Sequence, residues 1–323
     1  MKQKLHSFVW KCFTVTLLIL TSYFTSFSQY GESTSFWEAG ITAGPSNFLG
    51  DLGGKMGKGT TFLKDNNIQM TKFMMGAYLT YQPNEWFGVR LAANFGTIEG
   101  DDAIIKGKGS YEESRKIRNS NFKSKIQEVF LLAEFYPTVF FEYEPSDIYH
   151  KFRPYGVIGV GGFHFNPQGT DLQTGEWVAL KPLHTEGQGF AEYPDRPEYK
   201  LTQLNIPMGV GLKYFASEAM SLSMEVIHRK TFTDYIDDVS KDYIDPALFY
   251  SYLTPSQAAL AQRMANKADP GGLGSVPAFG PGDKRGTPEH NDGYYSICLK
   301  VGFRLGTNSD KRWRNSTRCP VNF

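Results

Sequence analysis

The stretch "YSICLKVGFRL", residues 295–305, alternates in character at every position. One face carries the apolar or aromatic side chains Tyr295, Ile297, Leu299, Val301, Phe303 and Leu305. The other face carries Ser296, Cys298, Lys300, Gly302 and Arg304. A repeat of two residues predicts a β-strand with one apolar face. Such a strand fits a soluble sandwich as well as a membrane barrel, so the rest of the chain has to decide.

The same alternation recurs along the chain and predicts eight strands. We expect them at residues 35–44, 71–82, 86–97, 124–136, 153–165, 200–215, 219–230 and 293–305. Most are long enough for a tilted bilayer strand of about 9–11 residues. Strands of soluble sandwiches are usually shorter, with about 5–6 residues.

The connections between these strands alternate between short and long. "QPNE" (82–85) joins the second and third strands, and "ASEA" (216–219) joins the sixth and seventh. Much longer links follow the first, third, fifth and seventh strands, at 45–70, 98–123, 166–199 and 231–292. Short periplasmic turns and long surface loops are typical of outer-membrane barrels. The sequence therefore predicts an all-β fold, an eight-stranded antiparallel transmembrane outer-membrane β-barrel with long extracellular loops.

The N-terminus has the features of a secretory signal peptide. Lys2, Lys4 and Lys11 precede the apolar run 12–24, and Ser26 and Ser28 supply small residues for a cleavage site. The run is shorter than the roughly 20 residues of a membrane-spanning helix; a core helix is the alternative. We expect a signal peptide at 1–28, a barrel at 29–305, and a periplasmic tail at 306–323. Both termini of the mature chain would then lie in the periplasm of an outer-membrane protein.

The composition argues against several classes of function. The chain has 34 Lys and Arg against 33 Asp and Glu, which gives no support for nucleic-acid binding. Of the three cysteines, Cys298 and Cys319 lie outside the signal peptide, too few for a disulfide scaffold or a metal framework. "GVIGVGG" (156–162) lacks the spacing of a dinucleotide loop. His164 and His228 are isolated strand residues. We expect no cofactor and no enzymatic activity.

The inward faces of the predicted strands carry charges of both signs. They are Glu38, Arg90, Glu128, Glu134, Lys213, Glu225, Arg229, Lys300 and Arg304. Arg90 and Glu134 should lie at similar depth on adjacent strands, as should Glu38 and Arg304 across the closure of the barrel. Buried charges must be paired, so we interpret these residues as a structural ion-pair core. A proton relay and a water-filled pore are the alternatives; large inward groups such as Tyr78 disfavour the pore.

The stretch "RKTFTDYIDDVSKDYID" (229–245) gathers five aspartates in the fourth surface loop. Their spacing does not match the calcium loop of an EF-hand. We interpret the run as a solvated or self-capping loop. The alternative is a surface calcium site built from Asp234, Asp237, Asp238 and Asp242.

Further along the same loop, "LTPSQAALAQRMANKADPGG" (253–272) predicts a short helix. Thr254 fits the N-cap, Pro255 the first turn, and Gln257 the capping-box partner. Gly271 fits a position beyond the end of the helix.

The tail "GTNSDKRWRNSTRCPVNF" (306–323) extends past the last strand and is basic. We predict a partner contact through Trp313, Arg314, Arg318 and Cys319. An unpaired cysteine in an oxidising compartment suggests an intermolecular disulfide or a free thiol at Cys319. An inert chain end is the alternative.

Several segments, in order along the chain, resemble the PorG-type outer-membrane barrels of the type IX secretion machinery. They are "FLGDLGG" (48–54), "PYGVIGVGGFHFNPQG" (154–169), "GEWVALKPLHTEGQG" (175–189), "QLNIPMGVGLKY" (203–214), "RKTFTDYIDDVSKDYIDPAL" (229–248), "RGTPEHNDGYY" (285–295) and "RCPVNF" (318–323). The resemblance implies a non-enzymatic component of a secretion and gliding apparatus. It also implies association with a periplasmic ring made of a lipoprotein and its partner protein.

Two other functions remain open at this point. A structural or adhesive outer-membrane barrel would act through its surface loops. A small membrane enzyme acting on lipid would need an accessible acid–base or nucleophile set near one membrane face, and the sequence shows none above chance.

Overall fold

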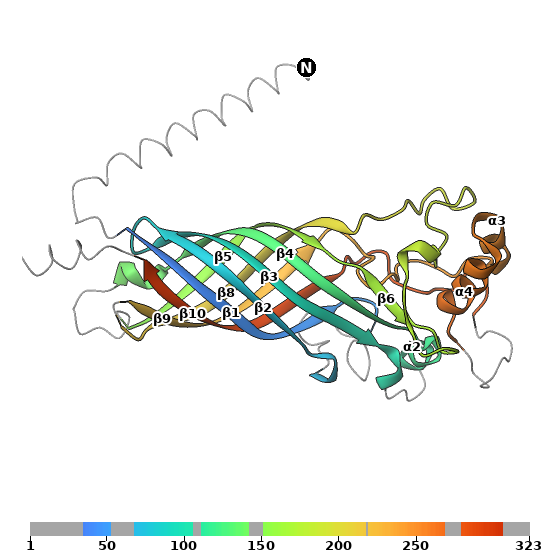
Figure 1. The fold of residues 1–323 in the computed structure, drawn as a ribbon, viewed down its shortest axis with the longest axis horizontal. Helices are drawn as coiled ribbons and strands as arrows, with labels where there is room; N and C mark the ends of the chain where they lie inside the picture. The colour runs from blue at the N-terminus through green and yellow to red at the C-terminus, as the bar shows by residue number, and fades with distance from the viewer. Residues whose placement is uncertain are drawn as a thin grey trace, which may run out of the picture. The chain divides into compact units, whose positions relative to one another are not determined.

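A computed structural model describes residues 35–52, 68–105, 111–141, 151–217, 219–268 and 279–305 (Figure 1). The predicted signal peptide and the predicted tail lie outside these residues. Among the described residues, no helix has the length and apolar character needed to cross a membrane.

Eight of the described strands form a closed antiparallel barrel. They are β1 (Phe36–Leu49), β2 (Lys72–Gln82), β3 (Phe87–Asp101), β4 (Asn121–Phe135), β5 (Phe152–His164), β8 (Thr202–Phe215), β9 (Met220–Thr231) and β10 (Gly293–Leu305). Each pairs with the next, and β1 pairs with β10, where Trp37 lies opposite Leu305. The barrel sheet therefore has no open edge, and the strands tilt along the barrel in Figure 1.

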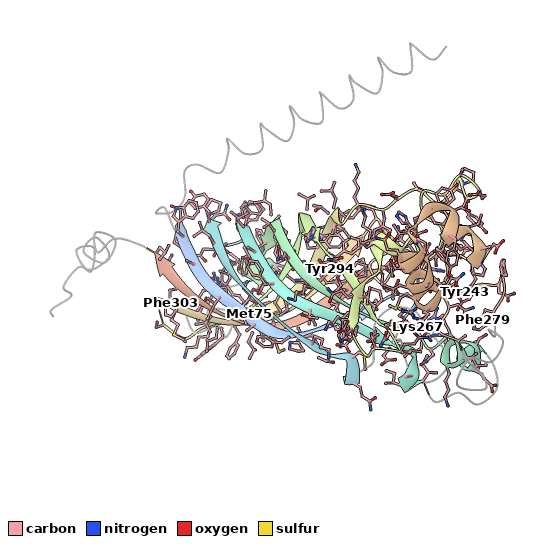
Figure 2. All side chains as sticks on the ribbon, turned by 45° about the vertical axis from the view of Figure 1, so that its right-hand side comes forward. Met75, Tyr243, Lys267, Phe279, Tyr294 and Phe303 are labelled. Atoms are coloured by element: carbon pink, nitrogen blue, oxygen red, sulfur yellow. The ribbon has the colours of Figure 1, made fainter. Side chains whose placement is uncertain are left out.

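The outward face of the barrel is apolar. Leu204, Leu299 and Val160 expose 69%, 66% and 65% of their surface, and Met75 and Phe303 on the outside of the barrel are also exposed (Figure 2). A water-soluble protein would not leave so continuous an apolar surface uncovered. A belt of outward apolar side chains is the lipid-facing surface of an outer-membrane barrel. The predicted fold is therefore confirmed.

The connections fall into two groups by the end of the barrel at which they join the strands. The links 83–86, 136–151 and 216–219 join strand ends on the side that also holds Phe36 and Leu305, and 136–151 is the longest of these three. The long links leave the opposite end: loop 1 (50–71), loop 2 (102–120), loop 3 (165–201) and loop 4 (232–292). We call these the short-turn end and the long-loop end.

Three strands extend further toward the long-loop end than the sequence predicts. β1 continues to Leu49, β3 continues to Asp101, and β4 begins at Asn121, which pairs with Asp101. The apolar alternation fades before these ends because loops, not lipid, cover the strands there. Tyr295, which belongs to the apolar face of its strand, is also buried, and its hydroxyl accepts from Asn47 on β1 at 3.1 Å.

The long-loop end also carries smaller elements. They are η2 (Ile68–Met70), η3 (Asp102–Ile104), α2 (Tyr111–Arg118), β6 (Pro167–Thr170), β7 (Trp177–Ala179), η6 (Lys181–Leu183), η7 (Pro246–Leu248), α3 (Phe249–Tyr252) and α4 (Pro255–Ala265). The helix η4 (Pro137–Phe141) lies in a short link. The sequence predicts α4 with its Thr254–Gln257 capping box, and both are present. The helix ends at Ala265 with Asn266 as its C-cap, earlier than the predicted stop, and Gly271 lies outside the described residues.

Candidate functional site

The barrel interior is bridged by a charged cluster that joins opposite walls. Arg90 on β3 donates to both carboxylate oxygens of Glu225 on β9, at 2.9 and 2.6 Å. The same guanidinium donates through Nε to Glu134 on β4. Lys300 on β10 places its Nζ 3.5 Å from Glu225 Oε2. All four side chains are 4% exposed or less, so their charges neutralise one another inside the barrel.

Two tyrosines complete the hydrogen bonding of this cluster. The hydroxyl of Tyr155 donates to Glu225 at 2.8 Å, and the hydroxyl of Tyr136 donates to Glu134 at 2.6 Å. Buried carboxylates are stable only when their oxygens are satisfied in this way. The structure thus brings Arg90 and Glu134 into direct contact and adds partners from the far wall, which a neighbour-strand argument does not identify.

A second ionic group lies around Glu38. Its carboxylate accepts from Lys213 Nζ at 2.7 Å, from the Tyr78 hydroxyl at 3.1 Å and from the Ser221 hydroxyl at 2.9 Å. Arg304 is the direct strand neighbour of Glu38, but its guanidinium lies 3.7 Å from the centroid of the Phe36 ring. The cation against Glu38 is therefore Lys213 from β8.

A third group lies toward the long-loop end of the barrel. Arg229 Nη2 donates to Glu128 at 2.7 Å, and Asn94 and Tyr294 donate to the same carboxylate at 2.7 and 2.6 Å. Beyond it, a cluster of buried apolar and aromatic side chains fills the barrel mouth. It includes Phe48, Leu52, Met74, Ile98, Phe122, Ile126, Phe163, Phe165, Tyr199, Ile236 and Val239. Paired charges and this apolar cluster occupy the space that a diffusion pore would need.

Loops 3 and 4 pack on each other around a separate hydrophobic core. It contains Leu180, Leu183, Phe190, Ile244, Phe249, Ala258, Ala261, Met264 and Ala265. We call these packed loops the cap. Tyr243, which stacks on Phe279 with 5.2 Å between ring centroids, lies in it, while Tyr294 lies nearer the barrel (Figure 2).

Two buried ion pairs stabilise the long loops, one between loops 3 and 4 within the cap and one inside loop 2. Arg285 Nη1 lies 2.8 Å from Glu186, whose carboxylate also accepts from the backbone of Ser240 and Lys241. In loop 2, Arg118 Nε lies 2.7 Å from Asp102. Arg118 also donates to the backbone oxygens of loops 1 and 4, at Asp51 and Arg285. The long loops are thus held together by charges that the sequence analysis did not single out.

Three of the five aspartates in the loop 4 run are buried, which corrects the expectation of a solvated loop. The expected self-capping is present, because Asp237 accepts from the Val239 N–H and Asp245 from the Ala247 N–H. Asp237 and Asp238 are 0% exposed and Asp234 is 8% exposed. Asp238 accepts from the Thr185 and Tyr199 hydroxyls, and burial raises its pKa to about 6. Loops 1 and 3 supply this cover from distant parts of the sequence.

The four aspartates considered for calcium do not converge on one point. Asp237 caps backbone N–H groups, Asp238 binds hydroxyls of loop 3, and Asp242 lies 3.8 Å from Arg196. In the described part of the chain, no group of three or more His, Cys, Asp or Glu side chains is placed to hold a metal ion.

Of the two cysteines outside the predicted signal peptide, Cys298 is buried in the barrel interior and has a free thiol. The predicted partner-contact residues Trp313, Arg314, Arg318 and Cys319 all lie outside the described residues.

The solved structures to which the chain is similar include several outer-membrane proteins. The attachment invasion locus protein Ail of Yersinia pestis shares 10% identity, with 84% of this chain and 99% of Ail covered and a TM-score of 0.34. OprG of Pseudomonas aeruginosa shares 14% identity, with 86% and 99% covered and a TM-score of 0.33. Outer membrane protein W of E. coli shares 14% identity, with 85% and 100% covered and a TM-score of 0.32. The barrel assignment itself rests on the strand pairing and the apolar belt described above.

No curated protein matches this sequence. One family model, described as "Domain of unknown function (DUF6089)", matches residues 11–177, which is just over half of the 323 residues. Its match covers the barrel strands β1 to β5, loops 1 and 2, and the beginning of loop 3 up to residue 177. The chain is an outer-membrane β-barrel protein that belongs to the DUF6089 family.

Proposed function

We propose that this protein is a non-enzymatic outer-membrane component of the type IX secretion and gliding machinery, which anchors or positions a periplasmic ring. The observation that carries the proposal is the cross-barrel contact between Arg90 and Glu225. A barrel whose interior is bridged by paired charges offers no path for solutes. We therefore place its function at the two ends of the barrel.

Three of the segments that resemble the PorG-type barrels contact one another in space. The backbone N–H of Leu52, in 48–54, donates to Asp237, in 229–248, at 3.0 Å. The N–H of Thr287, in 285–295, donates to Asp51 at 2.7 Å. The resemblance therefore covers a packed structural unit at the long-loop end, which supports a relationship of the whole barrel rather than of isolated motifs.

The short-turn end is the side on which a periplasmic ring would be met. The chain enters β1 and leaves β10 at this end, where Trp37 lies opposite Leu305. With the long loops facing outward, the basic tail 306–323 starts in the periplasm. In this proposal Trp313, Arg314, Arg318 and Cys319 contact the ring lipoprotein and its partner, and Cys319 forms an intermolecular disulfide.

The test is deletion of residues 308–323, followed by measurement of cargo secretion and of barrel abundance in the outer membrane. The proposal predicts that secretion fails while the barrel reaches the membrane at the normal level. As a matched control, the double substitution Tyr250→Ser with Phe232→Ser changes two exposed side chains at the long-loop end, which are 52% and 55% exposed. This variant should secrete normally.

A second candidate is a structural or adhesive barrel that acts through its surface loops. The observation that favours it is the cap, because loops 3 and 4 have a hydrophobic core of their own. The cap also exposes the aromatic side chains of Tyr250 and Tyr252. Normal secretion after deletion of 308–323, together with lost surface binding in the Tyr250→Ser, Phe232→Ser variant, would favour this candidate over the secretion role.

A further inference from the structure

Four aspartates from three chain segments meet at the long-loop end. Asp51 follows β1, Asp234 and Asp237 follow β9, and Asp292 precedes β10. Asp237, Asp292 and Asp234 are 0%, 1% and 8% exposed. Buried carboxylates are normally stabilised by a cation. Yet across the described residues no ion pair joins any of these four to a lysine, arginine or histidine. By contrast, cationic partners are present for the buried carboxylates of Glu38, Asp102, Glu128, Glu134, Glu186 and Glu225.

Backbone N–H groups hold these carboxylates in place. Asp237 accepts from Leu52 at 3.0 Å and from Val239 at 3.0 Å. Asp292 accepts from Ile236 at 2.8 Å. With the bond from Thr287 to Asp51, these contacts fasten loop 1 to both arms of loop 4.

Three carboxylate oxygens of the cluster have no hydrogen-bond partner of normal geometry, although the Ser240 hydroxyl interacts with the Asp234 side chain. Neither carboxylate oxygen of Asp234 accepts a hydrogen bond of normal geometry, and Asp292 Oδ1 accepts none. The negative charge of Asp51 acts on Asp234, and the negative charges of Asp234, Asp237 and Asp51 act on Asp292. A buried carboxylate oxygen without a hydrogen-bond partner, subject to the charge of other carboxylates, is a position for a bound proton.

The charged groups around the cluster do not supply the missing positive charge. Glu186 from loop 3 and Glu289 from loop 4 add negative charge. Arg118 from loop 2 faces Asp51 and Asp237, but its guanidinium is bound to Asp102. Arg285 from loop 4 is bound to Glu186.

Burial and the neighbouring carboxylates shift the cluster toward the protonated form. Burial raises the pKa of Asp234 to about 8, against a partial opposing effect of the Ser240 hydroxyl. Burial and the charges of Asp51 and Asp234 raise the pKa of Asp237 well above its usual range. Burial and the charges of Asp237 and Asp234 do the same for the pKa of Asp292.

We propose that Asp51, Asp234, Asp237 and Asp292 form a proton-binding latch that closes the long loops over the barrel mouth. In the closed latch the carboxyl groups share bound protons and loop 1 stays fastened to loop 4. As pH rises, these protons pass to water, the carboxylates repel one another, and the contacts of Leu52, Ile236 and Val239 are released. The closed form binds more protons than the open form, so rising pH favours opening by up to about tenfold per pH unit for each proton released.

The test is amide hydrogen exchange on the full-length barrel in lipid nanodiscs, corrected for the intrinsic exchange rate at each pH. The amides of Leu52, Ile236 and Val239 donate directly to the cluster. Between pH 7 and pH 9 their protection should fall by about tenfold or more in the wild type. Asp234→Asn keeps the shape of a protonated carboxyl but has no proton to release. In this variant the fall in amide protection should therefore be smaller, by up to about tenfold per pH unit. Infrared spectra of the wild type should show a protonated carboxyl band that declines over the same range.

The matched control is Asp195→Asn, an exposed aspartate of loop 3 whose carboxylate binds Lys241. It should keep the full pH dependence of the wild type. Protection that does not change with pH, or an equal change in wild type and Asp234→Asn, would overturn the latch. So would the absence of the infrared band at pH 7. Calcium that restores protection at pH 9 and binds with measurable heat would replace the proton latch by a metal site.

Discussion

Arg90 and Glu225 form a bidentate ion pair across the barrel, from β3 to β9. In the closed strand order these strands are separated by three others in either direction. The pair therefore crosses the interior rather than following the wall. Glu134 and Lys300 join the pair, so two buried carboxylates and one lysine ammonium are arranged around one guanidinium.

Loss of Arg90 should destabilise the barrel strongly. Arg90→Met leaves Glu134 and Glu225 buried without their main cation, a defect that costs about 3–5 kcal/mol. Urea unfolding in lipid vesicles, followed by tryptophan fluorescence, measures the change. Arg304→Met is the matched control, because Arg304 is only partly buried and lies over Phe36 near the membrane interface. It should cost less than about 1 kcal/mol; equal losses in both variants would contradict the structural role of the cross-barrel cluster.

The purified protein should not conduct ions. The three ionic groups and the apolar cluster at the mouth fill the interior, so planar bilayers with wild-type protein should show no regular conductance steps. Replacing Arg90, Glu134 and Glu225 together by alanine removes the central guanidinium and both of its carboxylate partners, and leaves Lys300 in a wet space. This variant should leak if it folds. Stable single-channel steps from the wild type would show that the charged cluster lines a pore.

A glycine allows β1 and β10 to approach each other at the barrel closure. A Cβ added at Gly44 would lie 2.1 Å from the carbonyl oxygen of Ile297 and 2.8 Å from Cα of Cys298. Backbone atoms cannot give way as a flexible side chain can, so Gly44→Ala should prevent closure of the barrel.

The matched control for this position is Gly156→Ala on β5. A Cβ at Gly156 would meet its nearest atom, the Gly209 carbonyl oxygen, at 4.0 Å. The gel shift between folded and heat-denatured barrel reports folding. Gly156→Ala should keep the folded band and Gly44→Ala should lose it; the reverse order would contradict the strand register.

Lys267 should weaken the cap at neutral pH. Lys267 is labelled in Figure 2. Burial and the charge of Arg285 lower its pKa to about 8, while its Nζ donates to Asn121 at 2.8 Å. A lysine whose folded pKa is depressed disfavours folding below that pKa, and the penalty shrinks as pH rises from about 8 to 10.5.

Lys267→Met should therefore stabilise the cap at pH 7 by about 1–2 kcal/mol, after the lost hydrogen bond is deducted. The gain should disappear near pH 10.5. Protease susceptibility of loop 4 as a function of pH measures both effects, with Lys284→Met, at an exposed position of the same loop, as control. A gain that grows with pH would contradict the assignment of a strained, buried ammonium.

The barrel can be predicted from sequence because its signal is local and repeated. The alternation in 295–305 and the strict succession of short and long links identify strand number, direction and lipid-facing side. Adjacent strands also place Arg90 beside Glu134. The bond from Arg90 to Glu225 escapes this reasoning, because it depends on the barrel diameter and not on neighbouring strands. The contact between Lys213 and Glu38 also cannot be predicted from strand order, because it depends on the lengths and directions of the two side chains.

The loops are harder to predict because their environment comes from distant segments. The aspartate run is expected in solvent by composition, but Leu52, Thr185 and Tyr199 cover it. The helix α4 is the exception, since its capping box and first-turn proline are local signals. The helix α2 and the short strands β6 and β7 have no comparable signal.

The most direct test of the secretion role is a mild-detergent pull-down of the tagged barrel from outer membranes, analysed on gels with and without reductant. The account predicts recovery of the ring lipoprotein and its partner with the wild type. It also predicts a shifted band that disappears on reduction and in Cys319→Ala, and loss of the ring when 308–323 are deleted. Recovery of the barrel without ring components would contradict the account.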